Sequence, residues 1–258
     1  MSGSSFRWPA KDASAEEILK WAIEEFGDRF AISTSFQATG MAIIDIAACL
    51  TGGDVRVFSL DTGRLHPETY ELIERVRGRY GIKIELVTPD SSELNRVQTL
   101  HGPNLFYESV TKRRLCCEIR KVRPLQRKLA TLDAWATGLR RSQSVSRELV
   151  DPVTLDEDHG GIVKVAPLAY WDNQQVWDYI KRNDVPTHKL YDEGYPSIGC
   201  APCTRAIKPG ESERAGRWWW EDAEADKECG MHTTPTGQLR RTLDVLLHEL
   251  LPLARATE

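Results

Sequence analysis

The sequence predicts an α/β fold, with a doubly wound parallel sheet. Short apolar segments alternate along the chain with longer segments whose apolar residues recur at helical spacing. A helix between two strands is a crossover connection, and such connections join parallel strands in a sheet that helices cover on both faces. Each predicted strand also ends in a polar loop, which is where sheets of this type bind their ligands.

The first helix is predicted from Ser14 to Gly27. Ser14 and Glu17 have the spacing of a capping box, in which each side chain accepts a hydrogen bond from the backbone N–H of the other residue. Apolar residues then recur on one face of the helix, at Ile18, Leu19, Ala22, Ile23 and Phe26. Gly27 ends the helix, because glycine readily adopts the backbone conformation that closes one.

The other elements follow from the same patterns. In order along the chain, they are a strand at Phe30–Ser33, a loop at 34–40, a buried helix at 41–50, a strand at 55–59, a helix at Pro67–Tyr80, a strand at 82–87, a helix at about 118–132 and a strand at 134–137. Gly52 and Gly53 separate the second helix from the second strand. From about Tyr191 onward the pattern changes, and this segment is expected to cover the sheet.

Three loops after predicted strands are rich in Ser, Thr, Asp or Arg: STSFQATG at 33–40, LDTGRLHP at 60–67 and TGLRRSQSVSR at 137–147. The first lies between a strand and a helix, where backbone N–H groups and the helix N-terminus favour an anion. An ordinary helix cap would explain the same residues. The glycine patterns of a P-loop and of a dinucleotide fingerprint are absent from this loop.

Five of the six cysteines fall in three short motifs. The motifs are the adjacent pair Cys116 and Cys117, the CxxC pair Cys200 and Cys203, and Cys229 in KECGMH. The first two motifs together supply enough thiolates to close one metal or iron–sulfur site. The sixth cysteine, Cys49, lies among apolar residues and is expected to be a core thiol.

The four paired cysteines admit three interpretations. Zinc sites favour cysteines separated by about two to four residues at both ends of the site, whereas the side chains of adjacent cysteines diverge. An iron–sulfur cubane has separate iron corners, so neighbouring cysteines can bind two of them, and the spacing favours the cluster over zinc. In the third interpretation the CxxC pair is a redox dithiol and the adjacent pair is incidental.

Cys229 is a candidate nucleophile. Lys227 and His232 lie close to it in the sequence, and nearby positive charge lowers the pKa of a thiol and raises its thiolate fraction. The segment around it is polar and contains glycine, which predicts exposure and mobility. A surface cysteine without a function is the alternative.

Arginines are the candidates for holding a sulfate or phosphate group, namely Arg140, Arg141, Arg147, Arg214 and Arg217. Guanidinium groups present planar pairs of donors that match tetrahedral oxyanions. For any single one of them, a solvated side chain on a surface loop is the alternative. The tryptophan triplet at 218–220 is expected to pack into a core rather than to stack on a base.

Composition restricts the partners. The formal net charge of −4 argues against extended nucleic-acid binding but allows a local basic pocket for a small anion. No apolar segment approaches the roughly 20 residues that a membrane span requires. The N-terminal residues MSGSSFRWPAKD lack the apolar stretch of a signal peptide, so a cytoplasmic location with reduced thiols is expected.

Taken together, the motifs resemble those of a known family. LDTGRLHPETYEL, CCEIRK, TGLRRSQS, GYPSIGCAPCTR, GRWWWE and KECGMH resemble the assimilatory sulfonucleotide reductases, and among them the iron–sulfur adenylyl-sulfate reductase type of the PAPS/APS reductase family. The resemblance covers about residues 31–232. It implies an adenine-nucleotide α-hydrolase-like fold with a mobile C-terminal tail. It also implies the reduction of adenosine 5′-phosphosulfate (APS) to sulfite and AMP in sulfate assimilation and cysteine biosynthesis.

The resemblance assigns roles to individual residues. Cys116, Cys117, Cys200 and Cys203 would hold a [4Fe–4S] cluster. Cys229 would be the nucleophile and would become an S-sulfonate, with His232 in the same motif and Lys121 between cluster and substrate. Substrate contacts would come from Ser33, Ser35, Leu60, Gly138, Arg147, Arg214 and Arg217.

The same resemblance implies the organisation and the partners. A single α/β catalytic domain, 1–258, would contain a nucleotide-binding core at 28–190 and, at 191–258, a segment that completes the cluster and carries the catalytic tail. Thioredoxin, or a glutaredoxin-like protein, would be the reductant that releases sulfite. Nucleic acid and membranes are not expected as partners, and a homo-oligomer is left open.

Other activities stay open beside APS reduction. A dual APS/PAPS reductase or a PAPS reductase would use the 3′-phosphorylated nucleotide, PAPS, although the four-cysteine pattern is associated with APS. A tRNA-thiolating enzyme would need a Ser-Gly-Gly-x-Asp-Ser loop, which residues 33–40 do not supply. A non-catalytic iron–sulfur protein would leave Cys229 and the arginines unexplained.

Two features depart from the family. Gln37 stands where many members carry glycine, which puts the backbone path of the 33–40 loop in doubt. The chain also continues beyond His232, with leucines at helical spacing at Leu239, Leu243, Leu246, Leu247 and Leu250. This pattern predicts an amphipathic helix that either docks the tail or joins subunits.

Overall fold

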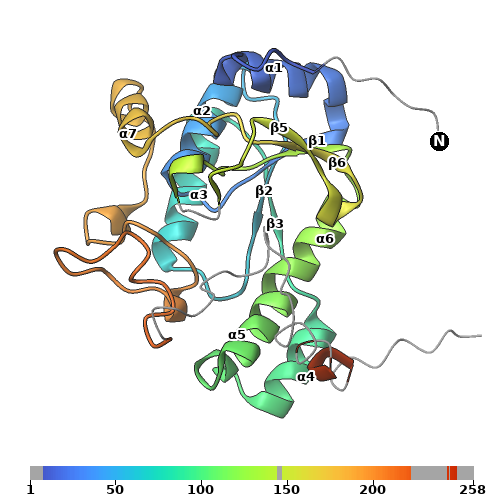
Figure 1. Ribbon diagram of the computed structural model, residues 1–258, viewed down its shortest axis with the longest axis vertical. Helices are drawn as coiled ribbons and strands as arrows, with labels where there is room; N and C mark the ends of the chain where they lie inside the picture. Colours follow the sequence, from blue (N-terminus) through green and yellow to red (C-terminus); the bar gives the residue numbers. More distant parts are fainter. Residues whose placement is uncertain (1–7, 144–146, 222–242, 244, 249–258) are drawn as a thin grey trace, which may run out of the picture. The chain divides into compact units, whose positions relative to one another are not determined.

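The structure is a computed structural model that describes residues 8–143, 147–221, 243 and 245–248 (Figure 1). The chain divides into two compact units. The first comprises Met1–Ser59, Pro67–Glu85 and Leu129–Tyr191, and the second comprises Leu60–His66, Leu86–Lys128 and Asp192–Glu258. The expected single catalytic domain with a nucleotide-binding core at 28–190 stays a prediction.

A six-stranded sheet in the order β3-β2-β1-β4-β6-β5 forms the centre of the first unit. The strands are β1 (Phe30–Ser33), β2 (Val57–Leu60), β3 (Ile84–Val87), β4 (Ala134–Ala136), β5 (Val153–Asp156) and β6 (Ile162–Val165). β1 pairs in parallel with β2 and β4, and β4 pairs in parallel with β6. The predicted α/β fold is therefore confirmed.

One hairpin was not predicted from the sequence. β5 pairs antiparallel with β6, so the sheet is mixed rather than wholly parallel. The signal that could have found this hairpin is the pair Gly160 and Gly161, which both have positive φ between the two strands. Positive φ is easily adopted by glycine and reverses the chain in tight turns.

Four helices share one apolar core with the sheet: α1 (Ala15–Phe26), α2 (Ala38–Thr51), α3 (Pro67–Tyr80) and α7 (Asn173–Arg182). Phe30 and Ile32 of β1 belong to this core. They lie on the same face of the sheet, since alternate residues of a strand point to the same side. Ala31, which points to the other face, is also buried. Both faces of this central strand are covered, as crossover connections require.

The structure confirms the capping box predicted for the first helix, but it does not confirm the burial predicted at the end of the second. The Ser14 hydroxyl accepts a hydrogen bond from the N–H of Glu17 at 3.2 Å, and the Glu17 carboxylate accepts one from the N–H of Ser14 at 2.7 Å. α2 begins at Ala38, earlier than predicted, and is buried only as far as Ala48. Cys49 lies beyond that point and is exposed, so the expectation of a core thiol was wrong.

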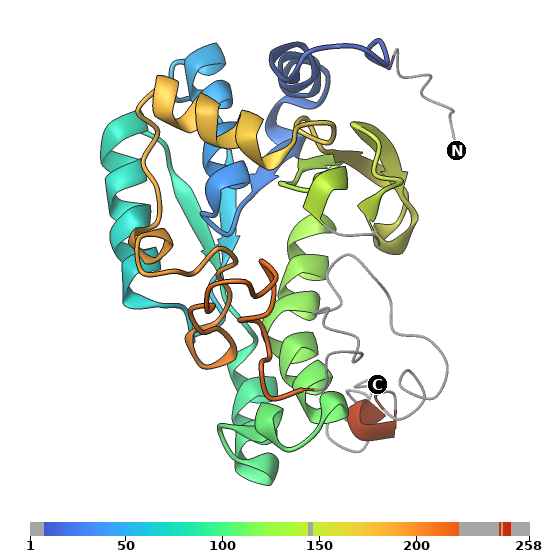
Figure 2. The same ribbon diagram turned by 60° about the vertical axis from the view of Figure 1, so that its left-hand side comes forward.

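Three helices of the second unit carry or support its cysteines: α4 (Ser91–His101), α5 (Val110–Cys117) and α6 (Arg123–Leu129). A π-helical turn at Glu118–Val122 joins α5 to α6 in one continuous helical segment (Figure 2). The helix predicted at 118–132 thus begins at Val110, where the Ser109 hydroxyl accepts a hydrogen bond from the N–H of Lys112 at 3.2 Å. The sequence pattern missed this start because α5 buries arginines as well as apolar residues.

The C-terminal helix docks onto the second unit. Leu243 is only 4% exposed and belongs to the apolar core that contains the four paired cysteines, and Leu246 and Leu247 pack against that core. Val245, on the other face of the helix, is 55% exposed. The described part of the predicted amphipathic helix therefore contacts its own chain. Leu239 and Leu250 lie outside the described residues.

We expect Leu243→Ala to lower the free energy of unfolding by about 2–5 kcal/mol, because the change removes a buried leucine and leaves a cavity. Val245→Ala is the matched control in the same helix, and we expect it to change the free energy of unfolding by less than about 0.5 kcal/mol. Urea unfolding followed by circular dichroism measures both. Equal effects of the two changes would show that the helix is not docked.

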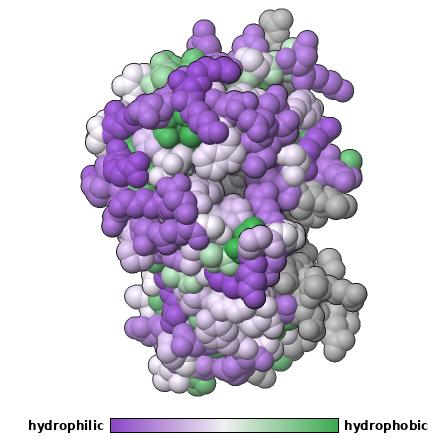
Figure 3. All heavy atoms as spheres, turned by 90° about the vertical axis from the view of Figure 1, so that its left-hand side faces the viewer, coloured by the Kyte–Doolittle hydropathy of each residue, from purple (hydrophilic) through white to green (hydrophobic). Residues whose placement is uncertain are grey.

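Within the described residues, no helix combines the length and the apolar composition that a bilayer span needs. The face of the molecule drawn in Figure 3 carries mostly hydrophilic residues, with apolar ones scattered among them.

Candidate active site

Four cysteines of the second unit line one cavity. Cys116 and Cys117 are the last residues of α5, and Cys200 and Cys203 begin and end the short 3₁₀ turn of the CxxC motif. Each of the four is 7–9% exposed. The other lining residues are Arg64, Phe106, Arg113, Arg120, Lys121, Pro202, Arg217 and Trp218. The structure thus brings the two cysteine motifs together, and their role as ligands stays a prediction.

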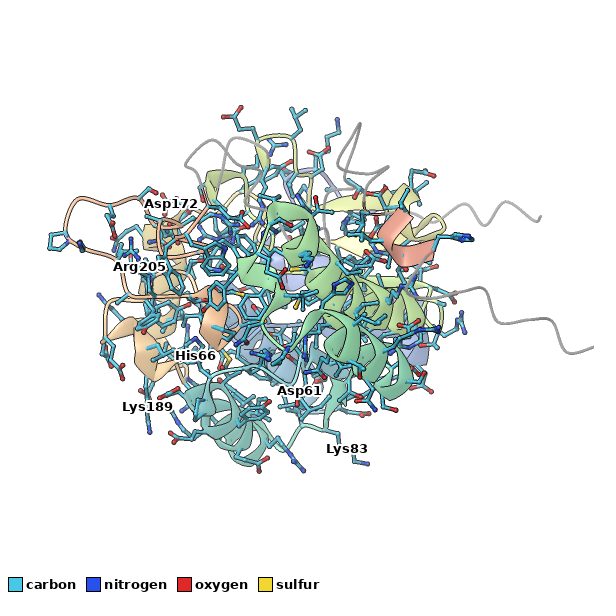
Figure 4. The ribbon with its side chains drawn as sticks, turned by 90° about the horizontal axis from the view of Figure 1, so that it is seen from below. Asp61, His66, Lys83, Asp172, Lys189 and Arg205 are labelled. Carbon is cyan, nitrogen blue, oxygen red and sulfur yellow. The ribbon has the colours of Figure 1, made fainter. Side chains whose placement is uncertain are left out.

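The loop at 60–66 links the two motifs. The buried Arg120 follows Cys117 in the π-helical turn, and its Nη1 donates a hydrogen bond to the Thr62 carbonyl at 2.6 Å. The Thr62 hydroxyl lies 3.3 Å from the Sγ of Cys200, and the N–H of Ala201 donates to the Arg64 carbonyl at 2.8 Å. π-helical turns are frequent at functional sites. Figure 4 labels Asp61 and His66, which stand near the two ends of this loop.

Burial and nearby cations act in opposite directions on these thiols. Burial raises the pKa of Cys116, and burial together with Cys200 raises the pKa of Cys203 to about 12. At Cys200 burial also acts to raise the pKa, but Lys121, the Thr62 hydroxyl and Arg217 outweigh it, so that the pKa lies below its ordinary value. The cations therefore outweigh the cost of burial at Cys200 but not at Cys116 or Cys203.

The donors in this cavity suit soft metals. Among the described residues that line it, the metal-binding side chains are all thiols. In the described part of the chain, no group of three or more His, Cys, Asp or Glu side chains is placed to hold a metal ion. Cluster ligands bind separate irons and need not converge on one atom. Four thiols in a buried cationic cavity therefore fit an iron–sulfur cluster.

Backbone pairing places Arg217 beside the CxxC motif. The N–H of Trp218 donates to the Cys203 carbonyl at 3.1 Å, and Arg217 forms an antiparallel bridge with Thr204. A Cβ at Gly199 would collide with the Arg217 guanidinium, so a side chain there would displace that group. Trp218 is buried, as predicted for the tryptophan triplet, whereas Trp219 is exposed.

The remaining residues predicted for this part of the site have different outcomes. Lys121 lines the cavity and is half-buried. Arg214 is half-buried, and its carbonyl accepts a hydrogen bond from the N–H of Arg217 at 2.9 Å. Leu60 ends β2. Cys229 and His232 lie outside the described residues, so their roles stay predictions.

In the first unit, the 33–40 loop connects β1 to α2. Phe36 is buried with a positive φ of 56°, and its N–H donates to the Thr34 hydroxyl at 2.9 Å. Gln37 has a φ of −79°, which any residue adopts, so the glycine of other family members is not needed there. The Gln37 amide donates to the Ser35 hydroxyl at 2.9 Å, and the Tyr191 hydroxyl accepts from the N–H of Ala38 at 2.8 Å.

The segment after β4 approaches the start of α2. A Cβ at Gly138 would lie 3.4 Å from Thr39, and the Gly138 carbonyl accepts a hydrogen bond from the Gln143 amide at 3.1 Å. Arg147 in turn donates to Gln143 at 2.5 Å. The buried Arg140 donates from Nε to the Thr39 hydroxyl at 3.1 Å. Gly138, Arg147 and the Ser33–Ser35 loop therefore belong to one region of the first unit.

The two adjacent arginines of this segment have different environments. Arg140 is buried, next to the first turn of α2. Arg141 is half-buried, pairs with Asp151 at 2.7 Å and donates from Nε to the Val150 carbonyl at 2.7 Å. Arg141 is therefore held by other protein groups, whereas Arg140 is a cation that the structure places next to Thr39 of the predicted anion loop.

Comparison with known proteins gives the relatives of this chain. Residues 29–206 match the family described as phosphoadenosine phosphosulfate reductase domain. The chain is 50% identical over 218 residues to the adenosine 5′-phosphosulfate reductase of Burkholderia cepacia. The matched residues make up 84% of this chain and 86% of that protein. It is 48% identical over 230 residues to the chloroplastic 5′-adenylylsulfate reductase 3 of Arabidopsis thaliana, covering 86% of this chain and 49% of the plant protein.

Solved structures show the same fold. Phosphoadenylyl-sulfate (PAPS) reductase from Candida auris, in a phosphate complex, matches with a TM-score of 0.64 and 31% identity over 76% of this chain and 91% of that chain. The FMN adenylyltransferase of Candida glabrata in complex with ATP matches with a TM-score of 0.52 at 14% identity, over 91% of this chain and 78% of that chain. The second likeness concerns the fold alone. The adenine-nucleotide α-hydrolase-like fold expected from the sequence is confirmed.

Proposed function

The chain belongs to the phosphoadenosine phosphosulfate reductase family, and we propose that within this family it reduces APS to sulfite and AMP. The observation that carries the proposal is the cavity in which two distant cysteine motifs meet among arginine and lysine side chains. Bacterial relatives that match most of the chain, from Burkholderia cepacia and Allochromatium vinosum, are named adenosine 5′-phosphosulfate reductase.

In this proposal Cys116, Cys117, Cys200 and Cys203 hold a [4Fe–4S] cluster. Support comes from the donor set, which consists of buried thiols, and from the cations that surround them. When bound, the cluster shapes the electrostatic field of the site rather than passing electrons. The 60–66 loop orients the ligands, since Thr62 contacts both Cys200 and Arg120.

The nucleotide is proposed to bind through Ser33, Ser35, Leu60, Gly138 and Arg147. The start of α2 offers backbone N–H groups to an anion, and Arg140 supplies positive charge close by. Gly138 allows the close approach of the chain after β4 to the first turn of α2. These contacts bind and orient the AMP part of the substrate.

Cys229 is proposed as the nucleophile. Its thiolate attacks the sulfur of APS, the bond from that sulfur to the phosphate oxygen breaks, and AMP leaves with the electron pair. The oxygens around the sulfur repel an incoming thiolate, and Lys121, Arg214 and Arg217 would lower this barrier by neutralising them. The product is an S-sulfonate on Cys229.

Thioredoxin, or a glutaredoxin-like protein, is proposed as the reductant. One of its thiolates attacks the Cys229 sulfur, sulfite leaves, and a mixed disulfide forms. The second thiol of the reductant breaks that disulfide and restores the Cys229 thiol. The cytoplasm, where such dithiols are kept reduced, stays the predicted location.

We expect kcat/KM for APS to exceed that for PAPS at least about tenfold, which corresponds to about 1.4 kcal/mol in transition-state binding. The 3′-phosphate of PAPS adds charge that needs its own donors, and a site without dedicated cations leaves it poorly compensated. Sulfite release from both nucleotides, with saturating thioredoxin, measures the ratio.

The same assay with ATP in place of APS separates the alternatives. Pyrophosphate release from ATP would indicate a base-thiolating enzyme, and no reaction with any nucleotide would indicate a non-catalytic iron–sulfur protein. Equal values for APS and PAPS would show a dual-substrate reductase, and a reversed ratio would contradict the APS assignment.

A further inference from the structure

Arg113 is a buried cation at the four-cysteine cavity that has no role in the proposed function. It is 0% exposed and lines the cavity from α5. Arg113 and Cys117 stand at positions i and i+4 of that helix, so their side chains share one face. Glu221 and Cys117 are side-chain hydrogen-bond partners of Arg113, and a guanidinium stays protonated in proteins. Arg113 is thus a permanent charge held next to a predicted cluster ligand.

Glu221 neutralises this charge. The Nε of Arg113 lies 2.6 Å from the Oε1 of Glu221, and both side chains are buried. A buried ion pair is strongly destabilised when one partner is removed, because the other charge is left without compensation. The ion pair therefore holds Arg113 in one place and cancels its charge. Arg113 differs in this respect from the cations that are expected to bind substrate.

Trp218 connects Arg113 to Arg217. The Cζ of Arg113 lies 4.5 Å from the centroid of the Trp218 ring, and the Cζ of Arg217 lies 4.7 Å from it. Cations within about 6 Å of an indole ring are attracted by its π-electrons, more strongly where water is excluded. Because Trp218 is buried, a shift of its ring changes the position of the Arg217 guanidinium.

We propose that Arg113 is a positioning residue for substrate binding. It fixes the indole of Trp218, against which the Arg217 guanidinium packs, and it ties this arrangement to Cys117. The backbone hydrogen bond from Trp218 to Cys203 makes a second tie to the cysteine site. The inference rests on the proposed function, in which Arg217 contacts the phosphosulfate group, and it adds Arg113, Trp218 and Glu221 to the residues on which substrate affinity depends.

A double-mutant cycle in substrate binding tests the proposal. APS binding to the anaerobically purified full chain is measured by calorimetry without reductant, for Arg113→Lys, Arg217→Lys and the double variant. Lysine keeps the charge but lacks the planar group that stacks on the indole. We expect Arg113→Lys to weaken APS binding about tenfold. The double variant should bind APS as weakly as Arg217→Lys alone, because Arg113 acts through Arg217.

Two further variants complete the test. Lys112→Gln is the matched control on α5, since Lys112 pairs with Glu108 and is more exposed, and it should leave APS affinity unchanged. Glu221→Gln removes only the charge that holds Arg113, and it should weaken APS binding with the same non-additive relation to Arg217→Lys. The visible absorption of each variant shows whether it keeps its cluster. If Arg113→Lys loses the cluster, the proposal is tested instead by the APS affinities of Glu221→Gln, Arg217→Lys and their double variant.

The outcomes separate the inference from the proposed function. If the unchanged protein does not bind APS, or if Arg217→Lys binds it normally, the proposed function is wrong in its substrate or its site. If Arg217→Lys weakens binding but the Arg113 or Glu221 variants leave it unchanged, or their effects multiply with that of Arg217→Lys, the positioning role is overturned.

Discussion

Cys229→Ser is expected to lower sulfite release from APS by about 10³-fold or more while leaving the visible absorption of the protein unchanged. A serine hydroxyl is far less ionised and less nucleophilic than a thiol, so the attack on the APS sulfur is lost. The absorption stays because the four cysteines that line the cavity are elsewhere in the chain. Steady-state sulfite release and the visible spectrum measure the two effects.

The intermediate gives a second test of the same prediction. Incubation of the unchanged protein with APS, without reductant, should add one SO₃ group to the peptide that contains Cys229, detectable by mass spectrometry, and thioredoxin should remove it. Cys49→Ser is the matched control. Cys49 is an exposed thiol on α2 that should not be modified, so this variant should still gain one SO₃ group. An adduct on Cys49 or on the CxxC motif would show that the nucleophile is misassigned.

Elements with strong local signals were predicted closely. α1 begins at its capping box, and β1 and α3 have the predicted bounds. In each case a short segment contains the reason for its own structure, such as a cap, an apolar stripe or Pro67 at the first helical position. Such signals do not depend on which distant residues pack against the element.

The misses occur where distant residues decide the structure. The helix predicted at about 118–132 begins earlier in the structure, at Val110 of α5. The earlier start was missed because α5 contains Arg113, and a charged residue is usually at the surface. Arg113 is buried through a partner, Glu221, that lies far along the chain. Cys49 shows the reverse case, since its neighbours are apolar but the end of α2 is exposed. Burial of a charge through pairing has no local signature, so residue patterns alone cannot find it.

The candidate site was predicted by its chemistry and not by its geometry. Counting thiols was enough to join two distant motifs into one hypothesis, and the structure places both in one cavity. The contacts that build the cavity were not predictable, because Thr62 belongs to a loop with no apolar pattern and meets Cys200 and Arg120 only in the folded chain. Trp218 was expected in a core, but its two guanidinium neighbours were not foreseen.

Cys203→Ser is expected to remove the cluster and, with it, APS reduction. A [4Fe–4S] cluster needs four thiolates, and a serine hydroxyl binds iron poorly. Iron and sulfide should fall from about four each per chain in the anaerobically purified protein to near zero in the variant. The change should also destabilise the second unit, because the buried Arg217 beside the cavity loses cluster-bound thiolates that would balance its charge.

Two controls make this prediction specific. Cys229→Ser keeps all four cysteines that line the cavity and should keep its iron, so loss of the cluster in Cys203→Ser alone separates ligand from nucleophile. Metal analysis of the unchanged protein separates the interpretations of the site. Stoichiometric zinc in place of iron would contradict the cluster, and a Cys203→Ser variant that retains all of its iron would show that Cys203 is not a ligand.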